Sequence, residues 1–251
     1  MVGRRGETPL VPPYNFRRSN TAMALATARP ASNLRAIGCV AFEYRDRCMS
    51  FTRRLFAVIP AAGHSRRMGQ PKLLLPWRNS TVIESVLAVL DHPAIAARAV
   101  VVRAGDVPLE EAVRRAGGLL VTPAVEPPDM CASVRCALEL IQRDSAPHDD
   151  DGWMLIPADH PVLDRGLIDG LIALWERDRP SILVPRVGDR RGHPTLFRWS
   201  FAREVDRIPV GCGLNWLLAE HAADVSELLV TGTAAITDLD TPEDYARLRS
   251  E

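Results

Sequence analysis

The sequence lacks three features that would each point to a class of protein: a long apolar run, a net charge and paired cysteines. No stretch of about 18 consecutive apolar residues occurs, which predicts that no helix spans a membrane. Basic and acidic residues both number 31, so no overall charge favours nucleic acid or a membrane surface. The five cysteines form no C-x-x-C pair. Their odd number and the absence of a secretory signal predict buried, reduced thiols in a cytoplasmic protein.

Two nucleotide-binding fingerprints are also missing, although one glycine-bearing loop has a composition suited to phosphate. Five residues separate Gly63 from Gly69, so the Walker A spacing is not met. No G-x-G-x-x-G occurs either, which argues against a NAD-binding oxidoreductase. The loop follows an apolar run and carries Arg66, Arg67 and Lys72 without an acidic residue. Because glycine lets backbone N–H groups point inward and three cations add to that preference, the loop predicts a polyphosphate ligand.

Residues 61–75 read A-A-G-H-S-R-R-M-G-Q-P-K-L-L-L, and this order resembles the signature loop of the MobA-like nucleotidyltransferases. Within that family, the Ala-Ala-Gly form is similar to the molybdenum cofactor cytidylyltransferase branch. The resemblance covers about residues 54–249 and implies a Rossmann-like fold of the nucleotide-diphospho-sugar transferase type. By family analogy, Ala62 favours CTP over GTP. The nucleotide-binding residues that the resemblance implies are Ala61, Ala62, Gly63, Ser65, Arg66, Gly69, Lys72 and Ser133.

The first 53 residues differ in composition from the rest of the chain. They are rich in Arg, Ala, Ser, Thr and Pro, and no hydrophobic periodicity persists. Such a segment buries little apolar surface, which predicts a disordered N-terminal extension. It has the composition of a targeting peptide, or it is the product of a start codon placed too far upstream. We favour Met49 as the true start, because Met-Ser-Phe-Thr-Arg-Arg then precedes the first predicted strand directly.

From residue 54 to residue 251, strands and helices alternate, which predicts a single α/β domain with a doubly wound, mostly parallel sheet. Expected strands lie at residues 55–59, 99–102, 119–121, 153–156, 182–184 and 226–230. Expected helices lie at residues 82–90, 109–116 and 133–142, after residue 164, near residues 214–221 and from residue 242. Thr81 and Thr241 are predicted to cap their helices, and Ser133 is expected to do the same. Residues 186–198 are expected to form a hairpin or loop across the site.

Two acidic motifs predict a magnesium site. Asp159, in Pro-Ala-Asp-His-Pro, follows a predicted strand, and ligands of open α/β sheets bind beyond the carboxyl ends of strands. A carboxylate there suits Mg²⁺, which prefers oxygen ligands. The motif resembles the family's P-x-D-x-P segment, which implies metal binding by Asp159; His160 stands where Met or Gln is more usual and is interpreted as a loop residue without a catalytic role. The stretch D-L-D-T-P-E-D resembles the family's closing segment, which implies that Asp240, and next Asp238, supplies a second ligand.

Two further segments resemble parts of the family pattern. R-R-G-H-P resembles the R-G-H-P segment near the acceptor, which implies acceptor binding by Arg191, Gly192 and His193. A hairpin turn with solvated arginines is the alternative. Residues 129–135, D-M-C-A-S-V-R, resemble G-M-S-x-S-(I/V)-R beside the nucleotide base, with Asp in place of glycine and Cys in place of the first serine. An ordinary capped helix is the alternative for this segment.

The resemblance implies an enzyme that transfers a nucleotidyl group and uses Arg67, Lys72 and Asp159 as catalytic residues, with Mg²⁺ on Asp159 and Asp240. A phosphate oxygen of the acceptor attacks the α-phosphorus of CTP, or less favourably GTP, and pyrophosphate leaves. The implied acceptor is molybdopterin, whose product would serve a molybdenum hydroxylase. A sugar or polyol phosphate acceptor is the first alternative. The second is a non-catalytic cofactor-delivery protein, which would not need the metal carboxylate.

Overall fold

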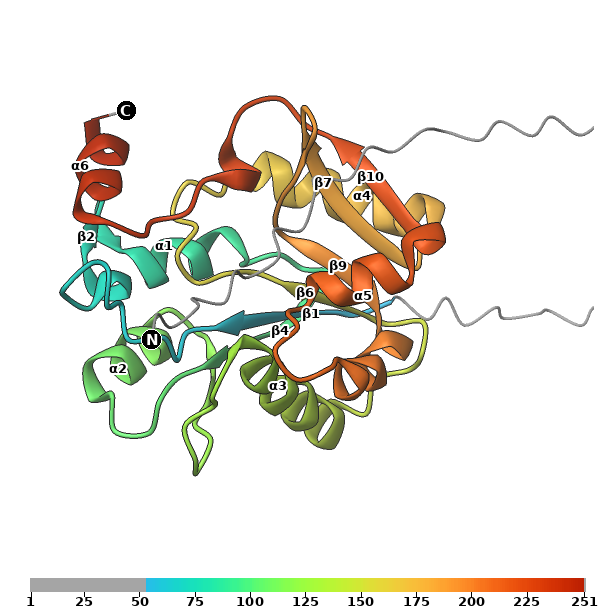
Figure 1. Cartoon of the computed structure of the whole chain (residues 1–251), viewed down its shortest axis with the longest axis horizontal. Coiled ribbons are helices and arrows are strands. Elements are labelled where there is room, and N and C mark those ends of the chain that lie inside the picture. Colours follow the sequence, from blue (N-terminus) through green and yellow to red (C-terminus); the bar gives the residue numbers. More distant parts are fainter. Residues whose placement is uncertain (1–52, 251) are drawn as a thin grey trace, which may run out of the picture. The chain divides into compact units, whose positions relative to one another are not determined.

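The structure, a computed structural model, describes residues 53–250, which form an α/β fold (Figure 1). Its strands are β1 (Leu55–Pro60), β2 (Pro76–Trp77), β3 (Ser80–Thr81), β4 (Ile95–Val101), β5 (Leu119–Val121), β6 (Gly152–Leu155), β7 (Ile182–Val187), β8 (Arg190–Arg191), β9 (Thr195–Arg198) and β10 (Val225–Leu229). Its α-helices are α1 (Val82–Val89), α2 (Val107–Arg115), α3 (Met130–Ser145), α4 (Arg165–Asp178), α5 (Asn215–Glu220) and α6 (Pro242–Ser250). Every predicted strand and helix is present, with ends shifted by a few residues.

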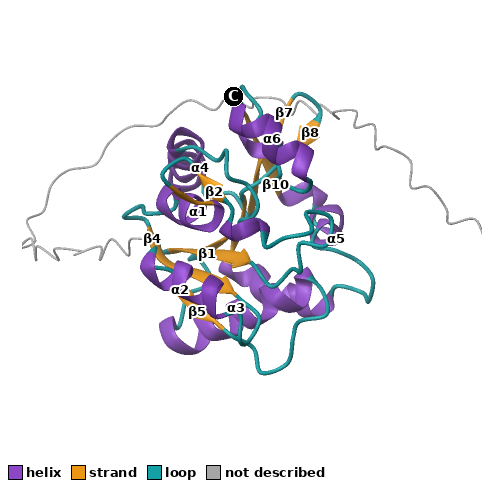
Figure 2. Cartoon of the chain, turned by 90° about the vertical axis from the view of Figure 1, so that its left-hand side faces the viewer, coloured by secondary structure: helices purple, strands orange, loops and turns teal. Residues whose placement is uncertain are grey.

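The central sheet is mostly parallel, as predicted. Its strands lie in the order β10-β7-β9-β6-β1-β4-β5, and β8 pairs with β7 beside this path. The four strands β6, β1, β4 and β5 are parallel neighbours, and β7 pairs in parallel with β10. Figure 2 shows β1 between a layer that contains α1 and α4 and a layer that contains α3. The loops that follow β1, β4, β5 and β6 therefore leave from the same edge of the sheet.

Strand β1 is buried on both faces and divides the core into two clusters. Leu55, Ala57 and Ile59 pack in one cluster, whereas Phe56 and Val58 pack in the other. This alternation follows from the period of two in a strand. A continuous apolar run is typical of a parallel strand with both faces covered. The apolar composition of β1 therefore holds the base of the loop that follows it in a fixed place.

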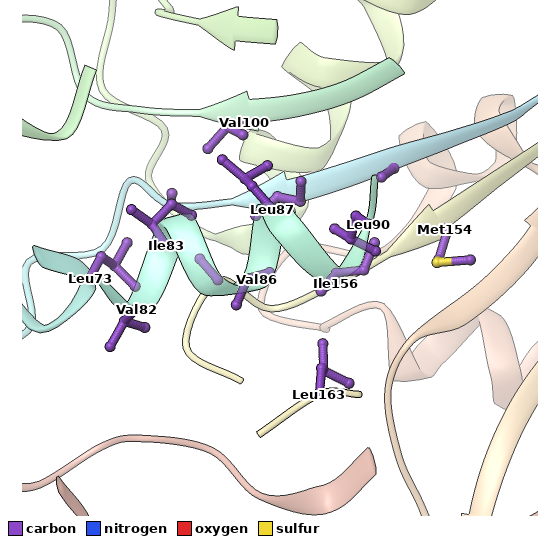
Figure 3. Packing of buried hydrophobic residues seen from close by; sticks show 14 of the residues in the cluster. Leu73, Val82, Ile83, Val86, Leu87, Leu90, Val100, Met154, Ile156 and Leu163 are labelled. Carbon is purple, nitrogen blue, oxygen red and sulfur yellow. The ribbon is translucent and has the colours of Figure 1, made fainter. Parts of the chain in front are cut away.

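Helix α1 closes one of these clusters, as Figure 3 shows. Its apolar side chains recur at helical spacing and are fully buried; they are Val82, Ile83, Val86, Leu87 and, at the C-cap, Leu90. Burying each such side chain stabilises the fold by about 1.5–3 kcal/mol relative to exposure. The helix begins in a capping box, because the Thr81 hydroxyl accepts from the N–H of Glu84 while Glu84 accepts from the N–H of Thr81.

One prediction about local structure is wrong, and a second holds only in part. Ser133 does not cap α3; Asp129 does, with Oδ1 accepting from the N–H of Ala132 at 2.7 Å. Asp and Ser cap helices about equally well, but the helix already begins at Met130, so the Ser133 hydroxyl lies inside it and donates to the carbonyl of Asp129. Residues 186–198 are more than a hairpin or loop. Strand β8 does form a hairpin with β7, but β9 enters the sheet as an antiparallel strand between β6 and β7.

The cysteine prediction holds only in part. Cys131 is buried and Cys136 is partly buried, but Cys212 is exposed in a glycine-flanked loop, and none of the three is in a disulfide. No helix among residues 53–250 is long and apolar enough to cross a membrane. The predictions for residues 1–52, including a start at Met49 and a disordered extension, lie outside the described residues.

Candidate active site

The ammonium of Lys72 is the centre of the site. Its three N–H groups have three acceptors: Asp159 Oδ2 at 2.5 Å, Asp240 Oδ1 at 2.9 Å and the carbonyl oxygen of Leu239 at 2.9 Å. Burial lowers the pKa of Lys72, but the two carboxylates outweigh this effect and hold the pKa above its ordinary value. Lys72 therefore stays charged throughout the neutral range. It is also the only lysine in the chain, among 30 arginines.

The second carboxylate is held from both sides. Asp240 Oδ2 pairs with Arg67 Nη2 at 2.8 Å, while its other oxygen faces Lys72. The segment that carries it is tied to the Asp159 loop by the backbone, because the N–H of Leu239 donates to the carbonyl of Asp159 at 2.9 Å. Leu239 is fully buried beside this contact. Asp238, two residues away, is exposed, so the structure brings Asp240 and not Asp238 to Lys72.

The loop between β1 and Lys72 turns back on itself at Ser65 and Gly69. Both residues have positive φ, 51° at Ser65 and 70° at Gly69, and the carbonyl of Ser65 accepts from the N–H groups of Met68 and Gly69. The Ser65 hydroxyl accepts from the N–H of Lys72 at 3.3 Å. Glycine adopts positive φ freely, whereas serine does so at a cost that is tolerated mainly at functional sites. The turn thus places Lys72 next to the two carboxylates.

The same loop offers unpaired donors. Among the described residues, the backbone N–H groups of residues 62–67 have no hydrogen-bond acceptor, although the N–H of Ala61 donates to Val101. Arg66 is exposed and has no ion-pair partner in the described part of the chain. Consecutive free N–H groups beside cations bind anions. The loop therefore has the donors that a polyphosphate requires.

A cavity of about 390 Å³ lies against this loop. It is lined by residues 60–67, 72–73, 126–130, Ser133, 157–159 and Asp240. These include most of the predicted nucleotide and metal residues; Gly69 instead borders an adjoining hollow of about 280 Å³ on the α2 side. Arg135 is not part of the lining. The cavity has the size of a small-ligand site, with cations and carboxylates together at one end.

The two carboxylates fit a divalent cation that is shared with a ligand. Asp159 and Asp240 converge on one ammonium and border the cavity, which shows that a cation between them is stabilised. No group of three or more His, Cys, Asp or Glu side chains within residues 53–250 could hold a metal alone. Mg²⁺ is commonly held by one or two carboxylates together with substrate phosphates. The donor set therefore suits a metal that arrives with a nucleotide.

A buried histidine pair lies next to Asp159. The rings of His160 and His193 meet edge to face with centroids 5.6 Å apart, and the Nδ1 atom of each is buried without a partner among the described residues. Burial lowers the pKa of His160 despite the opposing charge of Asp159. Burial, with the neighbouring His160, lowers the pKa of His193 to about 4. Both rings are therefore neutral at physiological pH.

This pair predicts a loss of stability in acid. The unfolded chain protonates His193 near pH 6.5, whereas the folded chain resists until about pH 4, so the unfolded state binds more protons in that window. Stability contributed by the neutral ring is present at pH 7, and about 3 kcal/mol of it is lost as the pH falls to 4. Urea unfolding of the parent and of His193→Gln at stepped pH measures this. Between pH 7 and pH 4 the free energy of unfolding should fall by about 3 kcal/mol less in the variant than in the parent. Equal decreases in the two proteins would contradict a neutral, buried His193.

The predicted acceptor residues lie apart from the cavity lining. Arg191 is at the sheet edge, where its Nε pairs with Glu227 at 3.0 Å. Gly192 is buried so closely that a Cβ there would lie 2.2 Å from the carbonyl oxygen of Ala235. The N–H of His193 donates to that same oxygen at 2.7 Å. Glycine is therefore needed at 192 for backbone packing, and His193 is brought to the site only through its contact with His160.

Several residues of the site were not predicted from the sequence. Glu126 borders the cavity from the loop after β5, and His64 contacts it from the loop after β1. Arg103, in the loop after β4, contacts the other ring nitrogen of His64. A usable signal was present, because both loops follow parallel strands, and ligands bind at that edge of the sheet. The backbone carbonyl of Leu239 carries no such signal in the sequence.

An open α/β sheet with a loop of free N–H donors and paired carboxylates at its carboxyl edge is typical of nucleotide-binding domains. Residues 57–225 match the model of the MobA-like NTP transferase domain, which is most of the chain. The protein belongs to this family. The resemblance found in the loop at residues 61–75 is thereby confirmed.

Named relatives divide between two kinds of acceptor. The chain is 24% identical over 205 residues to a probable molybdenum cofactor guanylyltransferase from Mycobacterium avium, covering 80% of this chain and 98% of that protein. It is 23% identical over 190 residues to the molybdenum cofactor cytidylyltransferase of Escherichia coli, covering 75% and 92%. It is 32% identical over 144 residues to a 2-C-methyl-D-erythritol 4-phosphate cytidylyltransferase from Actinobacillus pleuropneumoniae, and spans only 58% of the length of that relative.

A solved structure agrees in fold. Rv0371C of Mycobacterium tuberculosis, in complex with manganese, superposes with a TM-score of 0.63 at 27% identity, covering 79% of this chain and 99% of that one. The mixed α/β architecture with a mostly parallel sheet is thus shared with a protein solved with manganese.

Proposed function

We propose that this protein transfers CMP from CTP to the phosphate of molybdopterin and releases pyrophosphate. The observation that carries the proposal is the Lys72 ammonium between Asp159 and Asp240, at the end of a loop in which the N–H groups of residues 62–67 have no acceptor within residues 53–250. Such an arrangement has donors for a triphosphate and carboxylates for the metal that accompanies it. Family membership supports the reaction class.

The loop after β1 and the charged residues around Lys72 have distinct tasks in the proposed reaction. The N–H groups of residues 62–67 hold the phosphates, and Arg67 and Lys72 neutralise the charge that grows on the α-phosphate and on the leaving pyrophosphate. Asp159 and Asp240 would hold Mg²⁺, which supplies Lewis-acid neutralisation of phosphate oxygens when it is bound. The acceptor's phosphate oxygen attacks directly, so no covalent enzyme intermediate is needed. Catalysis comes from positioning and charge neutralisation.

The base and the acceptor are supported by different observations. Ala62 lies in the cavity wall and favours cytosine by family analogy. The relatives named for molybdenum cofactor support a molybdopterin acceptor, although one of them is a guanylyltransferase. A polyol phosphate acceptor is the second candidate, because the methylerythritol phosphate enzyme is also similar to this chain. Arg191, Gly192 and His193 remain the proposed acceptor segment, with His193 nearest to Asp159 through His160.

A pyrophosphate-release assay tests the proposal. The full chain is supplied with Mg²⁺, each NTP in turn, and either molybdenum-loaded molybdopterin or a polyol phosphate. We expect release with CTP and molybdopterin. Release with GTP instead would support nucleotidyl transfer but contradict the assignment of CTP as the nucleotide. Release with the polyol phosphate alone would contradict the assignment of molybdopterin as the acceptor. If a folded protein releases no pyrophosphate with any pair of nucleotide and acceptor, the non-catalytic delivery role would be the remaining alternative.

A further inference from the structure

The two ends of the cavity are bordered by different charged side chains. Lys72, Asp159 and Asp240 gather at the end beside β1 and β6, whereas Glu126 borders the other end from the loop after β5. In the strand order, β6 and β5 are three spacings apart, or about 14 Å. A nucleotide that places its phosphates at Lys72 and fills this cavity would extend its base toward the loop after β5.

Few polar side chains are available at that end. Asp129 caps α3 through Oδ1, and the Ser133 hydroxyl donates to the Asp129 carbonyl. Glu126 has no such structural task. Its Oε1 accepts from His64, while its Oε2 has no partner among the described residues, and half of the side-chain surface is exposed. Glu126 is thus a carboxylate with a free acceptor oxygen at the base end.

The contacts of His64 settle which way its hydrogen bond to Glu126 runs. Arg103 Nη1 contacts His64 Nδ1, and a guanidinium can only donate, so Nδ1 accepts. The proton of the neutral ring is then on Nε2, which donates to Glu126. Arg103 is itself fixed by Asp106 at 2.7 Å. This chain of contacts across three loops orients the carboxylate at a defined place.

We infer that Glu126 is a specificity-determining residue that selects nucleobases bearing an amino group, with His64 as its positioning residue. An ionised carboxylate only accepts hydrogen bonds, so it pairs with the N4 amino group of cytosine. The matching position of uracil is a carbonyl oxygen, which would leave two acceptors facing each other without a proton. The inference deepens the proposed function, because it states why CTP is chosen over UTP at the same site.

Nucleotide binding without an acceptor tests this inference. Calorimetric titration of the full chain with CTP and with UTP, both with Mg²⁺, should show CTP binding about tenfold more tightly or better. Glu126→Gln should bring the two dissociation constants to within about threefold, because an amide both donates and accepts. Glu139→Gln, an exposed carboxylate on α3, is the matched control and should keep the parent ratio. An unchanged ratio in Glu126→Gln, or equal binding by the parent, would overturn the inference.

The positioning role has its own readout. His64→Gln keeps an N–H donor and should retain part of the CTP preference, whereas His64→Ala should lose most of it while melting at the parent temperature. A full CTP preference in His64→Ala would overturn this role. The titration contains no acceptor, so a tenfold preference with no pyrophosphate release overturns the proposed function alone. If the parent protein releases pyrophosphate but Glu126→Gln leaves the ratio of the CTP and UTP dissociation constants unchanged, the inference alone is overturned. If the parent protein binds no nucleotide, both the inference and the proposed function are overturned.

Discussion

Replacing Lys72 by alanine is expected to lower the rate of nucleotidyl transfer by about 10²–10³ or more while the protein stays folded. Loss of one preorganised charge contact in a phosphoryl-type transition state costs about 3–4 kcal/mol in the barrier. Lys72 donates three hydrogen bonds and, in the part of the chain that the structure describes, is the only side chain that touches both Asp159 and Asp240 through one atom. The measurement is pyrophosphate release at saturating nucleotide, with circular dichroism and a thermal melt to check folding.

A matched variant separates this role from general charge. Arg203→Ala removes an exposed cation from the residue 199–207 segment, which is not part of the cavity lining, and should keep the parent rate. Lys72→Arg keeps the charge but cannot direct three donors from one atom, so it should recover little. A Lys72→Ala rate within twofold of the parent would refute the assignment.

The uniqueness of Lys72 allows a sharper version of the same test. Reductive methylation modifies primary amines, and in this chain these are Lys72 and the N-terminus alone. Dimethylation keeps the positive charge but removes two of the three N–H donors. We expect the methylated protein to lose most of its activity, and CTP with Mg²⁺ to protect it. Methylating Lys72→Arg reports the effect of the N-terminus by itself, and full activity of the dimethylated parent would show that charge alone suffices.

Neutralising either carboxylate is expected to have an effect of similar size. Asp159→Asn and Asp240→Asn should each lower the transfer rate by about 10²–10³ and raise the Mg²⁺ concentration needed for half-maximal activity. The physical reason is that an amide oxygen is a weaker ligand for a hard dication than a carboxylate. Both variants also leave Lys72 one charged partner, so the loop geometry should be retained.

Asp238→Asn is the matched control for these variants. It removes the same charge two residues from Asp240, at an exposed position that does not border the cavity. Its rate and its Mg²⁺ dependence should equal those of the parent. A response at Asp238 equal to that at Asp240 would mean that net charge, and not ligation, sets the effect. Unchanged Mg²⁺ dependence in both Asp159→Asn and Asp240→Asn would refute the metal role.

Much of the fold was predictable because its signals are local. The apolar run of β1, the helical spacing in α1 and the capping box at Thr81 are each encoded within a few consecutive residues, and the structure has all three. The misassigned cap of α3 had a local cause as well, since Asp129 and Ser133 are both good caps and only the backbone decides between them. Strand β9 was missed because four residues of mixed polarity do not show which strands will flank them.

The sequence by itself determined the family's signature loop at residues 61–75, the α/β alternation and the position of Asp159 at the end of a strand, because each depends on neighbouring residues. Only the tertiary structure decided which groups meet. Lys72 contacts Asp159 across 87 residues and Asp240 across 168, and His64 meets Glu126 across 62. Those meetings depend on the strand order β6-β1-β4-β5 and on the return of the C-terminal segment to the sheet edge. Strand order is set by the packing of the whole core, and hydrophobic periodicity within one segment carries no information about it.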